Sequence, residues 1–243
     1  MRNIGILPFD KGYLFENAKK MGFELSEAQL NTLEHYYKVL VDYNNKVNLT
    51  AVTDPKGVAI THFVDSLTLL LADIKEGERV ADIGAGAGFP SVPVGIFRPD
   101  LDLTLIDSLN KRITFLEYLS DELKRPLTAL HLRAEEAGRK KDLRESFDVV
   151  CARGVAKIYL LCEYCLPLLK KGGRLICMKG PEPEAEIKEA KKALFELGGK
   201  VLDVKTFSLP DESGRSLVII EKISTTPDKY PRQSAKIAKS PLV

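Results

Sequence analysis

The sequence predicts a doubly wound α/β domain preceded by a helical extension. Three observations predict this fold class. After Gly77, short β-branched runs alternate with amphipathic helical patterns. The first of these runs ends in a glycine-rich turn, the place where open α/β sheets bind nucleotides. Before Gly77 the apolar residues recur at helical spacing. We therefore expect a seven-stranded, mostly parallel sheet with helices on both faces.

The first 77 residues are predicted to be mainly helical. Ser26–Gln29 has the form of a capping box, and apolar residues then recur every three or four positions, which predicts a helix over Glu27–Asn44. Asp54–Pro55 is typical of another helix start, with Asp as the cap and Pro in the first turn. In this second helix His62 and Asp65 lie three residues apart, so we expect them to form a local pair.

The rest of the chain is predicted to alternate between strands and helices. The predicted strands are Arg79–Ile83, Asp102–Asp107, Leu127–Leu132, Phe147–Ala152, Arg174–Met178, Lys200–Phe207 and Ser216–Glu221. The predicted helices are Pro90–Phe97, Asn110–Leu123, Lys157–Leu169 and Glu184–Leu197. The last two strands are too close in sequence for a helical crossover, so they should form an antiparallel hairpin. Alternating units that end in such a hairpin are typical of class I (Rossmann-like) S-adenosylmethionine-dependent methyltransferases.

Composition indicates an ordinary soluble protein: 44% of its 243 residues are hydrophobic and 29% are charged. No apolar run approaches the roughly 20 residues that span a bilayer, and Met1–Asp10 lacks the features of a secretory signal. We expect a cytoplasmic protein with no membrane partner. The net charge of +2 attracts a polyanion only weakly, so any affinity for nucleic acid must come from local patches.

The strongest local signal is Val80–Pro90, which reads Val-Ala-Asp-Ile-Gly-Ala-Gly-Ala-Gly-Phe-Pro. Glycines let the backbone turn tightly and approach a ligand closely, and Pro90 suits the first position of the next helix. The dinucleotide fingerprint has its third glycine three residues after the second, where this sequence has Phe89. The observed D-x-G-x-G-x-G instead predicts S-adenosylmethionine as the ligand, the alternative being a merely tight turn. The candidate cofactor-binding residues in this segment are Asp82, Gly84, Gly86, Gly88 and Phe89.

Asp107 ends the second predicted strand, 23 residues after Gly84. A carboxylate at this position can accept hydrogen bonds from ribose hydroxyls. Nicotinamide enzymes and methyltransferases share such an acid, so Asp107 supports nucleoside binding without choosing between the two.

Further motifs carry a resemblance that covers nearly the whole chain. They are Asn48–Val52, His62–Leu67, the glycine loop with Phe89–Pro90, Arg98–Asp100, Leu105–Ser108, Lys111–Arg112, Arg133–Glu136, Cys151–Arg153, Met178–Gly180 and Gly214–Arg215. With them the sequence resembles the methyltransferase G family, also called glucose-inhibited division protein B, which makes 7-methylguanosine in small-subunit ribosomal RNA. The resemblance implies transfer of a methyl group from S-adenosylmethionine to a guanine N7 in 16S rRNA, with the rRNA or the small ribosomal subunit as partner.

The resemblance also implies which residues form the cofactor pocket: Gly84, Phe89, Ala134, Glu135 and Arg153. Reasoning from position agrees, because Ala134 and Glu135 follow the third predicted strand and can meet an adenine amine. Phe89 could instead fill the core, and Glu135 could be an ordinary first-turn helix residue.

Candidate substrate-binding residues are basic side chains near the strand ends. Arg153 and Lys179 follow the fourth and fifth predicted strands, and Arg215 precedes the seventh. Such side chains can contact phosphates and hydrogen-bond to guanine. Lys111 and Arg112 begin a helix and either contact RNA or are simply solvated.

No catalytic side chain is expected, because guanine N7 carries an exposed lone pair that attacks without prior deprotonation. The turn Cys151–Gly154 lacks the Asn/Asp-Pro-Pro-aromatic sequence typical of adenine amino methylation. Cytosine C5 transfer needs a cysteine nucleophile, but the Pro-Cys and Thr-Cys pairs of those enzymes are missing around Cys151. Cys162 and Cys165 form a C-x-x-C without suitably spaced further ligands, so we expect no metal site.

The division into regions follows from these patterns. We expect a helical extension over residues 1–77, a cofactor-binding domain over 78–223 and a basic tail over 224–243, in a monomeric protein. From Lys229 onward the tail contains lysine and arginine but no acid. It is either an arm that contacts phosphates or a solvated terminus without structure.

Three other functions remain in view. The first is a methyltransferase for another RNA, a protein or a small molecule. The second is a nicotinamide oxidoreductase, which the Phe89 spacing disfavours. The third is an RNA-binding protein with an inactive cofactor site, against which the intact glycine loop argues.

Overall fold

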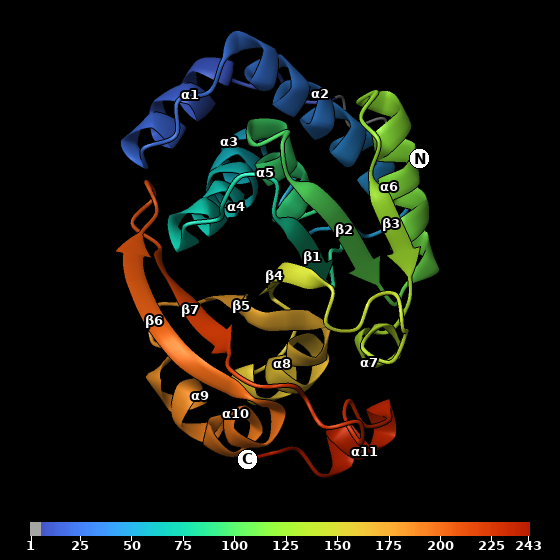
Figure 1. Ribbon diagram of the computed structural model, residues 1–243. Helices are drawn as coiled ribbons and strands as arrows, with labels where there is room; N and C mark the ends of the chain where they lie inside the picture. The colour runs from blue at the N-terminus through green and yellow to red at the C-terminus, as the bar shows by residue number, and fades with distance from the viewer. Residues whose placement is uncertain (1–5) are drawn as a thin grey trace.

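The computed structural model describes residues 6–243, so the beginning of the predicted extension, residues 1–5, lies outside the described residues. The seven strands form one sheet in the order β3-β2-β1-β4-β5-β7-β6 (Figure 1). Strands β1 to β5 are parallel, and β7 runs antiparallel between β5 and β6. The strands are β1 (Arg79–Ile83), β2 (Asp102–Asp107), β3 (Thr128–His131), β4 (Phe147–Arg153), β5 (Leu169–Lys179), β6 (Gly199–Ser208) and β7 (Gly214–Lys222). The predicted fold class and the terminal hairpin are confirmed.

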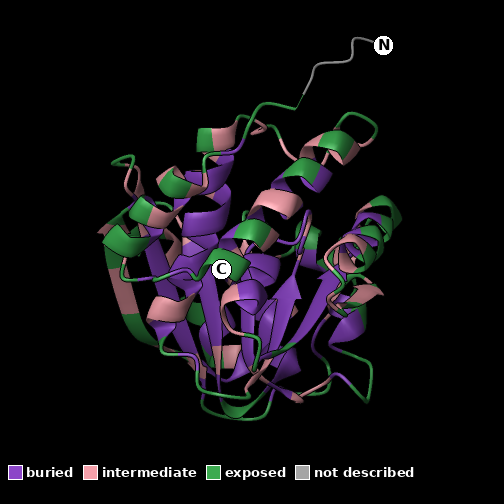
Figure 2. Cartoon of the chain, turned by 90° about the horizontal axis from the view of Figure 1, so that it is seen from above, coloured by how far each residue is buried: buried purple, intermediate pink, exposed green. Residues whose placement is uncertain are grey.

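Helices cover both faces of the sheet. One group consists of α1 (Lys11–Lys20), α2 (Glu27–Asn44), α3 (Pro55–Gly57), α4 (Asp65–Leu67), α5 (Ser91–Phe97) and α6 (Asn110–Glu122). The other consists of α8 (Ile158–Cys165), α9 (Glu184–Glu189) and α10 (Lys191–Leu197), while α7 (Ala134–Ala137) and α11 (Ser234–Lys239) lie near each other at one end (Figure 1). In Figure 2 the strands are largely buried, and exposed residues gather on outer helical faces and loops.

Alternation along the strands creates two hydrophobic cores. On β1, Val80 belongs to the core shared with the N-terminal helices, whereas Ala81 and Ile83 belong to the core beneath α8 and α10. This is the period-two pattern that a strand buried on both faces must have. The carboxyl ends of the parallel strands are thereby held at one rigid edge of the sheet.

The N-terminal helices begin where the sequence indicates. Ser26 and Gln29 form the reciprocal capping box of α2, and Asp54 caps α3 with Pro55 in its first turn. A continuous helical segment then follows, formed by the π-helix η1 (Val58–Val64), α4 and the 3₁₀ helix η2 (Thr68–Ala72). Because this extension shares one core with the sheet, its division from the domain at residues 77 and 78 stays a prediction.

Several predicted boundaries are wrong. Pro90 is the N-cap of α5 instead of its first residue. The predicted helix Lys157–Leu169 ends at Cys165 and passes through the 3₁₀ helix η3 (Leu166–Leu168), because Pro167 has no amide to continue the α-helical bonding. Leu169 therefore starts β5, five residues before the predicted Arg174. The predicted helix Glu184–Leu197 is broken at the buried Ala190, which lets both halves pack on α8.

The tail is ordered, so one of the two alternatives for it, a solvated terminus without structure, is wrong. It contains α11, and three of its apolar side chains are buried, namely Tyr230, Ile237 and Leu242. Within residues 6–243, no helix is both long and apolar enough to cross a membrane.

Candidate active site

The glycine loop between β1 and α5 is held in a conformation that requires glycine. Gly84, Gly86 and Gly88 have φ values of +74°, +59° and +94°, in the left-handed region that L side chains rarely adopt. A Cβ on Gly84 would stand 2.6 Å from a methyl group of Val155, in the segment that follows β4. Without a side chain at Gly84, the loop can approach the end of β4 closely.

Two adjoining cavities flank this loop, and together we call them the loop cavity. The smaller, of about 160 Å³, is lined by Ala134, Glu135 and Asp107. The larger, of about 430 Å³, is lined by Gly84, Gly86, Phe89, His62 and Arg112. Both include Gly84, Asp107, Ser108 and Val155 in their walls.

The loop cavity fits an adenosyl group with an attached amino acid. Its smaller part lies against the start of α7, where the amides of Ala134 and Glu135 have no partner within the helix because they belong to its first turn. Backbone donors and the Glu135 carboxylate there can meet the nitrogen-rich edge of an adenine. The larger part has room for the amino-acid portion of the ligand.

Asp107 lies in the loop cavity, but its carboxylate already accepts three hydrogen bonds. Gly86 N donates to it at 2.9 Å, Leu109 N at 2.9 Å and Arg112 Nη1 at 3.0 Å. A ribose hydroxyl must therefore share the carboxylate with these donors. Arg112 is thus placed inward as the ion-pair partner of Asp107, whereas the exposed Lys111 lines none of the cavities described here.

Asp82 and Gly88 support the loop from beneath and do not line the cavity. Asp82 is buried, its Oδ2 accepts a hydrogen bond from Ser91 N at 3.3 Å, and its Oδ1 has no partner. Burial raises the pKa of Asp82 to about 6. A Cβ on Gly88 would meet Val92 at 2.7 Å and the Tyr36 hydroxyl at 2.9 Å, so this glycine faces the helices.

The N-terminal helices hold Phe89 in place. Phe89 stacks on His62 and on Tyr36, with ring centroids 4.4 Å and 5.3 Å apart, and Tyr36 donates a hydrogen bond to the carbonyl of Ala87. Burial and the charge of Arg153 lower the pKa of His62 to about 4, so its ring is neutral at physiological pH. Phe89 therefore both packs in the core and reaches the wall of the loop cavity.

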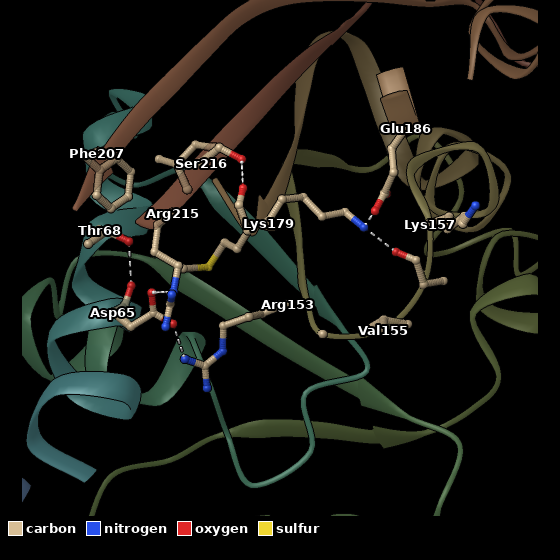
Figure 3. Close-up of a pocket in the computed structure, with 15 residues that line it drawn as sticks. Asp65, Thr68, Arg153, Val155, Lys157, Lys179, Glu186, Phe207, Arg215 and Ser216 are labelled. Atoms are coloured by element: carbon tan, nitrogen blue, oxygen red, sulfur yellow. Dashed lines mark hydrogen bonds and ion pairs between the residues drawn. The ribbon is translucent and has the colours of Figure 1, made fainter. Parts of the chain in front are cut away.

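A second cavity, of about 410 Å³, lies beside the loop cavity, and we call it the strand-end cavity. Asp65 lines one side of this cavity and lies between two arginines (Figure 3). Arg153 Nη1 donates to Asp65 Oδ2 at 2.8 Å, and Arg215 Nε donates to Oδ1 at 3.1 Å. Arg153 also donates to the carbonyl of Thr61 at 3.0 Å. The carboxylate thus fixes two cations that come from β4 and β7, the two strands that flank β5.

The expected pair between His62 and Asp65 does not form. Asp65 bonds to the two arginines, while His62 Nε2 lies 2.8 Å from the hydroxyl of Thr50. The segment that carries His62 is a π-helix, whose wider turns move residues three apart away from one another. Residues three apart are neighbours on the surface of an α-helix, and this spacing does not carry over to a π-helix.

Lys179 lines the strand-end cavity from the end of β5, and its ammonium group has two partners. Nζ donates to the carbonyl of Ala156 and to Glu186 Oε2, each at 2.7 Å (Figure 3). With Arg153, Lys179 and Arg215 against Asp65 and Glu186, the formal charges of these five side chains sum to +1. The structure therefore brings the three predicted strand-end cations into one cavity, separate from Lys111 and Arg112.

The cysteines do not form a reactive or metal-binding site. Cys151, Cys162, Cys165 and Cys177 are buried and unpaired by disulfides, and burial raises the pKa of each thiol. Among residues 6–243, no group of His, Cys, Asp and Glu is arranged to hold a metal ion.

Sequence reasoning did not identify several residues of the site. Val155 closes the loop, Glu186 holds Lys179, and Tyr36 supports Phe89. A local signal could have found only Val155, which follows Cys151–Arg153 at the end of β4. Glu186 and Tyr36 come from helices whose sequence patterns indicate nothing beyond packing.

Two solved structures show the same fold over about two thirds of this chain. Thermus thermophilus TrmN has a TM-score of 0.52 and 20% identity, with 66% of this chain and 48% of that chain covered. TYW2 of M. jannaschii, in complex with AdoMet, has a TM-score of 0.52 and 18% identity, with 66% of this chain and 76% of that chain covered. The fold and the glycine loop are those of class I S-adenosylmethionine-dependent methyltransferases, and the match to a methyltransferase family model assigns the chain to this class.

The family model described as rRNA small subunit methyltransferase G matches residues 29–217, and the chain belongs to this family. Relatives with the name ribosomal RNA small subunit methyltransferase G support this. The one from Lactobacillus johnsonii is 51% identical over 228 residues, with 92% of this chain and 95% of the relative covered. The one from Bacillus subtilis is 47% identical over 224 residues, with 91% and 94% covered.

Proposed function

We propose that this protein transfers the methyl group of S-adenosylmethionine to N7 of a guanine in 16S ribosomal RNA. One observation carries the proposal: the loop cavity and the strand-end cavity share Arg153, Gly154 and Val155. A donor bound in the first and a base bound in the second would meet at these residues. Family membership supports ribosomal RNA as the substrate.

The chemistry needs positioning more than acid–base groups. When bound, S-adenosylmethionine supplies an electrophilic methyl group on a sulfonium. The N7 lone pair of guanine attacks this carbon in line, the carbon–sulfur bond breaks, and the positive charge passes to the purine. No proton has to leave before the attack, which suits a site whose histidine is a weak base and beside which the Cys151 thiol is buried. Holding the two reactants in line can contribute roughly 7–11 kcal/mol.

The donor is proposed to lie along the loop cavity. Its adenine faces Ala134 and Glu135, its ribose lies near Asp107, and the Gly84 backbone passes close to the adenosyl group. The methionine portion lies toward Phe89 and Arg153. In this arrangement Asp82, Gly86 and Gly88 act by shaping the loop.

The guanine is proposed to enter the strand-end cavity. Arginine donors suit the guanine O6 acceptor, and Arg153 and Arg215 are held for this contact by Asp65. Phe207 supplies an aromatic side chain in the cavity wall, against which an unstacked base can pack. Lys179 and the exposed Lys111 are proposed to contact phosphates, whereas Arg112 acts through Asp107.

We also propose that the protein acts as a monomer in the cytoplasm. Ribosomal RNA, the proposed substrate, is in the cytoplasm.

Incubation of the purified protein with methyl-labelled S-adenosylmethionine and small ribosomal subunits lacking the modification tests this function. Digestion to nucleosides should give label in 7-methylguanosine only. Label in another nucleoside or in ribosomal protein would overturn the proposal in favour of another methyl acceptor. Absence of transfer to subunits and to free 16S rRNA, with donor binding intact, would indicate a different RNA or a small molecule.

A further inference from the structure

The segment after β7 is fastened to the domain by a buried ion pair. Arg232 donates to Glu163 of α8 through Nη2 at 2.6 Å and through Nε at 2.8 Å, and its backbone amide donates to the same carboxylate at 2.9 Å. The side chain of Glu163 is 1% exposed and that of Arg232 is 13% exposed. Such a bidentate pair fixes the orientation of both groups.

Two further arginines hold the backbone of this segment. Arg144 donates to the carbonyls of Thr226 and Tyr230, at 2.8 Å and 2.9 Å, and Arg139 donates to that of Lys229 at 3.3 Å. Pro231 packs closely on Gly138: a Cβ added to Gly138 would lie 3.0 Å from the ring of Pro231. The path of the chain across the region of α7 is therefore fixed before α11 begins.

This path brings the start of α11 to the adenine end of the loop cavity. Ser234 lines the smaller part of that cavity together with Gly84, Ala134 and Glu135. A neighbouring cavity, of about 620 Å³, is lined by Arg232, Gln233 and Ser234 and again by Glu135. Ser234 and Glu135 thus stand together between the donor site and the surface beyond it.

We propose that the C-terminal segment forms the outer wall of the adenine subsite through Ser234. Its attachment by Arg232 to Glu163 then sets the affinity for the donor. The Ser234 hydroxyl can both donate and accept a hydrogen bond, as the ring nitrogens and amino group of adenine require. This inference rests on the donor placement in the proposed function, and it adds a segment beyond Leu217, where the match to the family model ends.

Calorimetric titration with S-adenosylmethionine in the absence of RNA tests the wall directly. Ser234→Trp places a large side chain at a half-exposed position of the cavity wall, and it should raise Kd at least 10-fold. Arg232→Ala removes the attachment and should raise Kd about 5- to 10-fold, whereas Arg232→Lys should recover part of this loss. Lys239→Ala removes an exposed cation from the same segment and should leave Kd unchanged.

A second measurement distinguishes a C-terminal segment that contacts the donor from one that only stabilises the fold. Bound donor should slow tryptic cleavage at Lys236 and Lys239 in the wild-type protein, and this protection should disappear in Ser234→Trp. Wild-type affinity in Ser234→Trp, or cleavage that the donor does not affect, would overturn the inference while leaving the proposed function intact. A wild-type protein that binds no donor would instead refute the donor placement on which both depend.

Discussion

Asp65→Asn is predicted to impair methyl transfer much more than the loss of a surface charge would. The Asp65 side chain is 6% exposed and accepts from Arg153 at 2.8 Å and from Arg215 at 3.1 Å. Asparagine keeps one oxygen but turns an amide donor toward one of the two guanidinium groups. One arginine of the strand-end cavity therefore loses the partner that orients it.

The magnitude follows from the type of contact that is lost. A hydrogen bond to a charged group contributes roughly 1.5–3 kcal/mol. Arg153 and Arg215 are 17% and 26% exposed, so the released group can turn partly toward water and the cost falls near the lower end. We expect a loss of about 2 kcal/mol in the free energy of unfolding. Misplacement of a positioning group by an ångström can reduce kcat/KM by about 100-fold.

Glu78→Gln is the matched control. Arg174 donates to both oxygens of Glu78 at 2.8 Å, and the two side chains are 15% and 18% exposed. This pair lies just before β1 begins, at the opposite end of the strand from the glycine loop. The control should lose similar stability in urea unfolding but keep full transfer to small ribosomal subunits. Wild-type kcat/KM in Asp65→Asn, or an equal loss in Glu78→Gln, would refute the assignment of Asp65.

Three more predictions concern the loop, the shared arginine and a buried lysine. Gly84→Asp should abolish donor binding in calorimetry, because even a Cβ at this position would stand 2.6 Å from Val155. Gly77→Asp is the control: Gly77 also has a positive φ, but no atom lies within 4 Å of an added Cβ, so this variant should bind the donor normally. Arg153→Ala should lower kcat/KM by about 100-fold while the circular dichroism spectrum stays unchanged, and full activity would remove Arg153 from the site. Burial lowers the pKa of Lys222 from 10.5 to about 8. Because the pKa of Lys222 is lower in the folded than in the unfolded protein, the free energy of unfolding should rise as the pH increases from about 8 to 10.5. Between pH 7 and 9.5 the wild type should gain about 2 kcal/mol in the free energy of unfolding relative to Lys222→Met. A difference between the two proteins that does not change with pH in urea unfolding would contradict the burial of a charged amine.

The sequence predicted the features that depend on short-range patterns. Periodicity and caps located most strands and helices, and the spacing of Gly84, Gly86 and Gly88 located the loop. Boundaries failed where tertiary packing decided them, as at Ala190, whose break in the helix lets α9 and α10 both pack on α8. A helical pattern in sequence contains no information about such a partner.

The contacts between distant residues could not be predicted in this way. Asp65 meets Arg153 and Arg215 across 88 and 150 residues of sequence, and Glu163 meets Arg232 across 69. The sequence predicts a pair between Asp65 and His62 and gives no indication of the two arginines that Asp65 contacts. The sheet order places Arg153 and Arg215 together, because the ends of β4 and β5 and the start of β7 lie side by side. The role of Asp65 therefore became visible only from the three-dimensional arrangement.

A crystal structure with bound S-adenosylmethionine would test the central claim most directly. The account predicts adenine beside Ala134, Glu135 and Ser234, ribose near Asp107, and the methyl group directed past Arg153 into the strand-end cavity. A donor bound elsewhere, or one whose methyl group points away from the strand-end cavity, would contradict it.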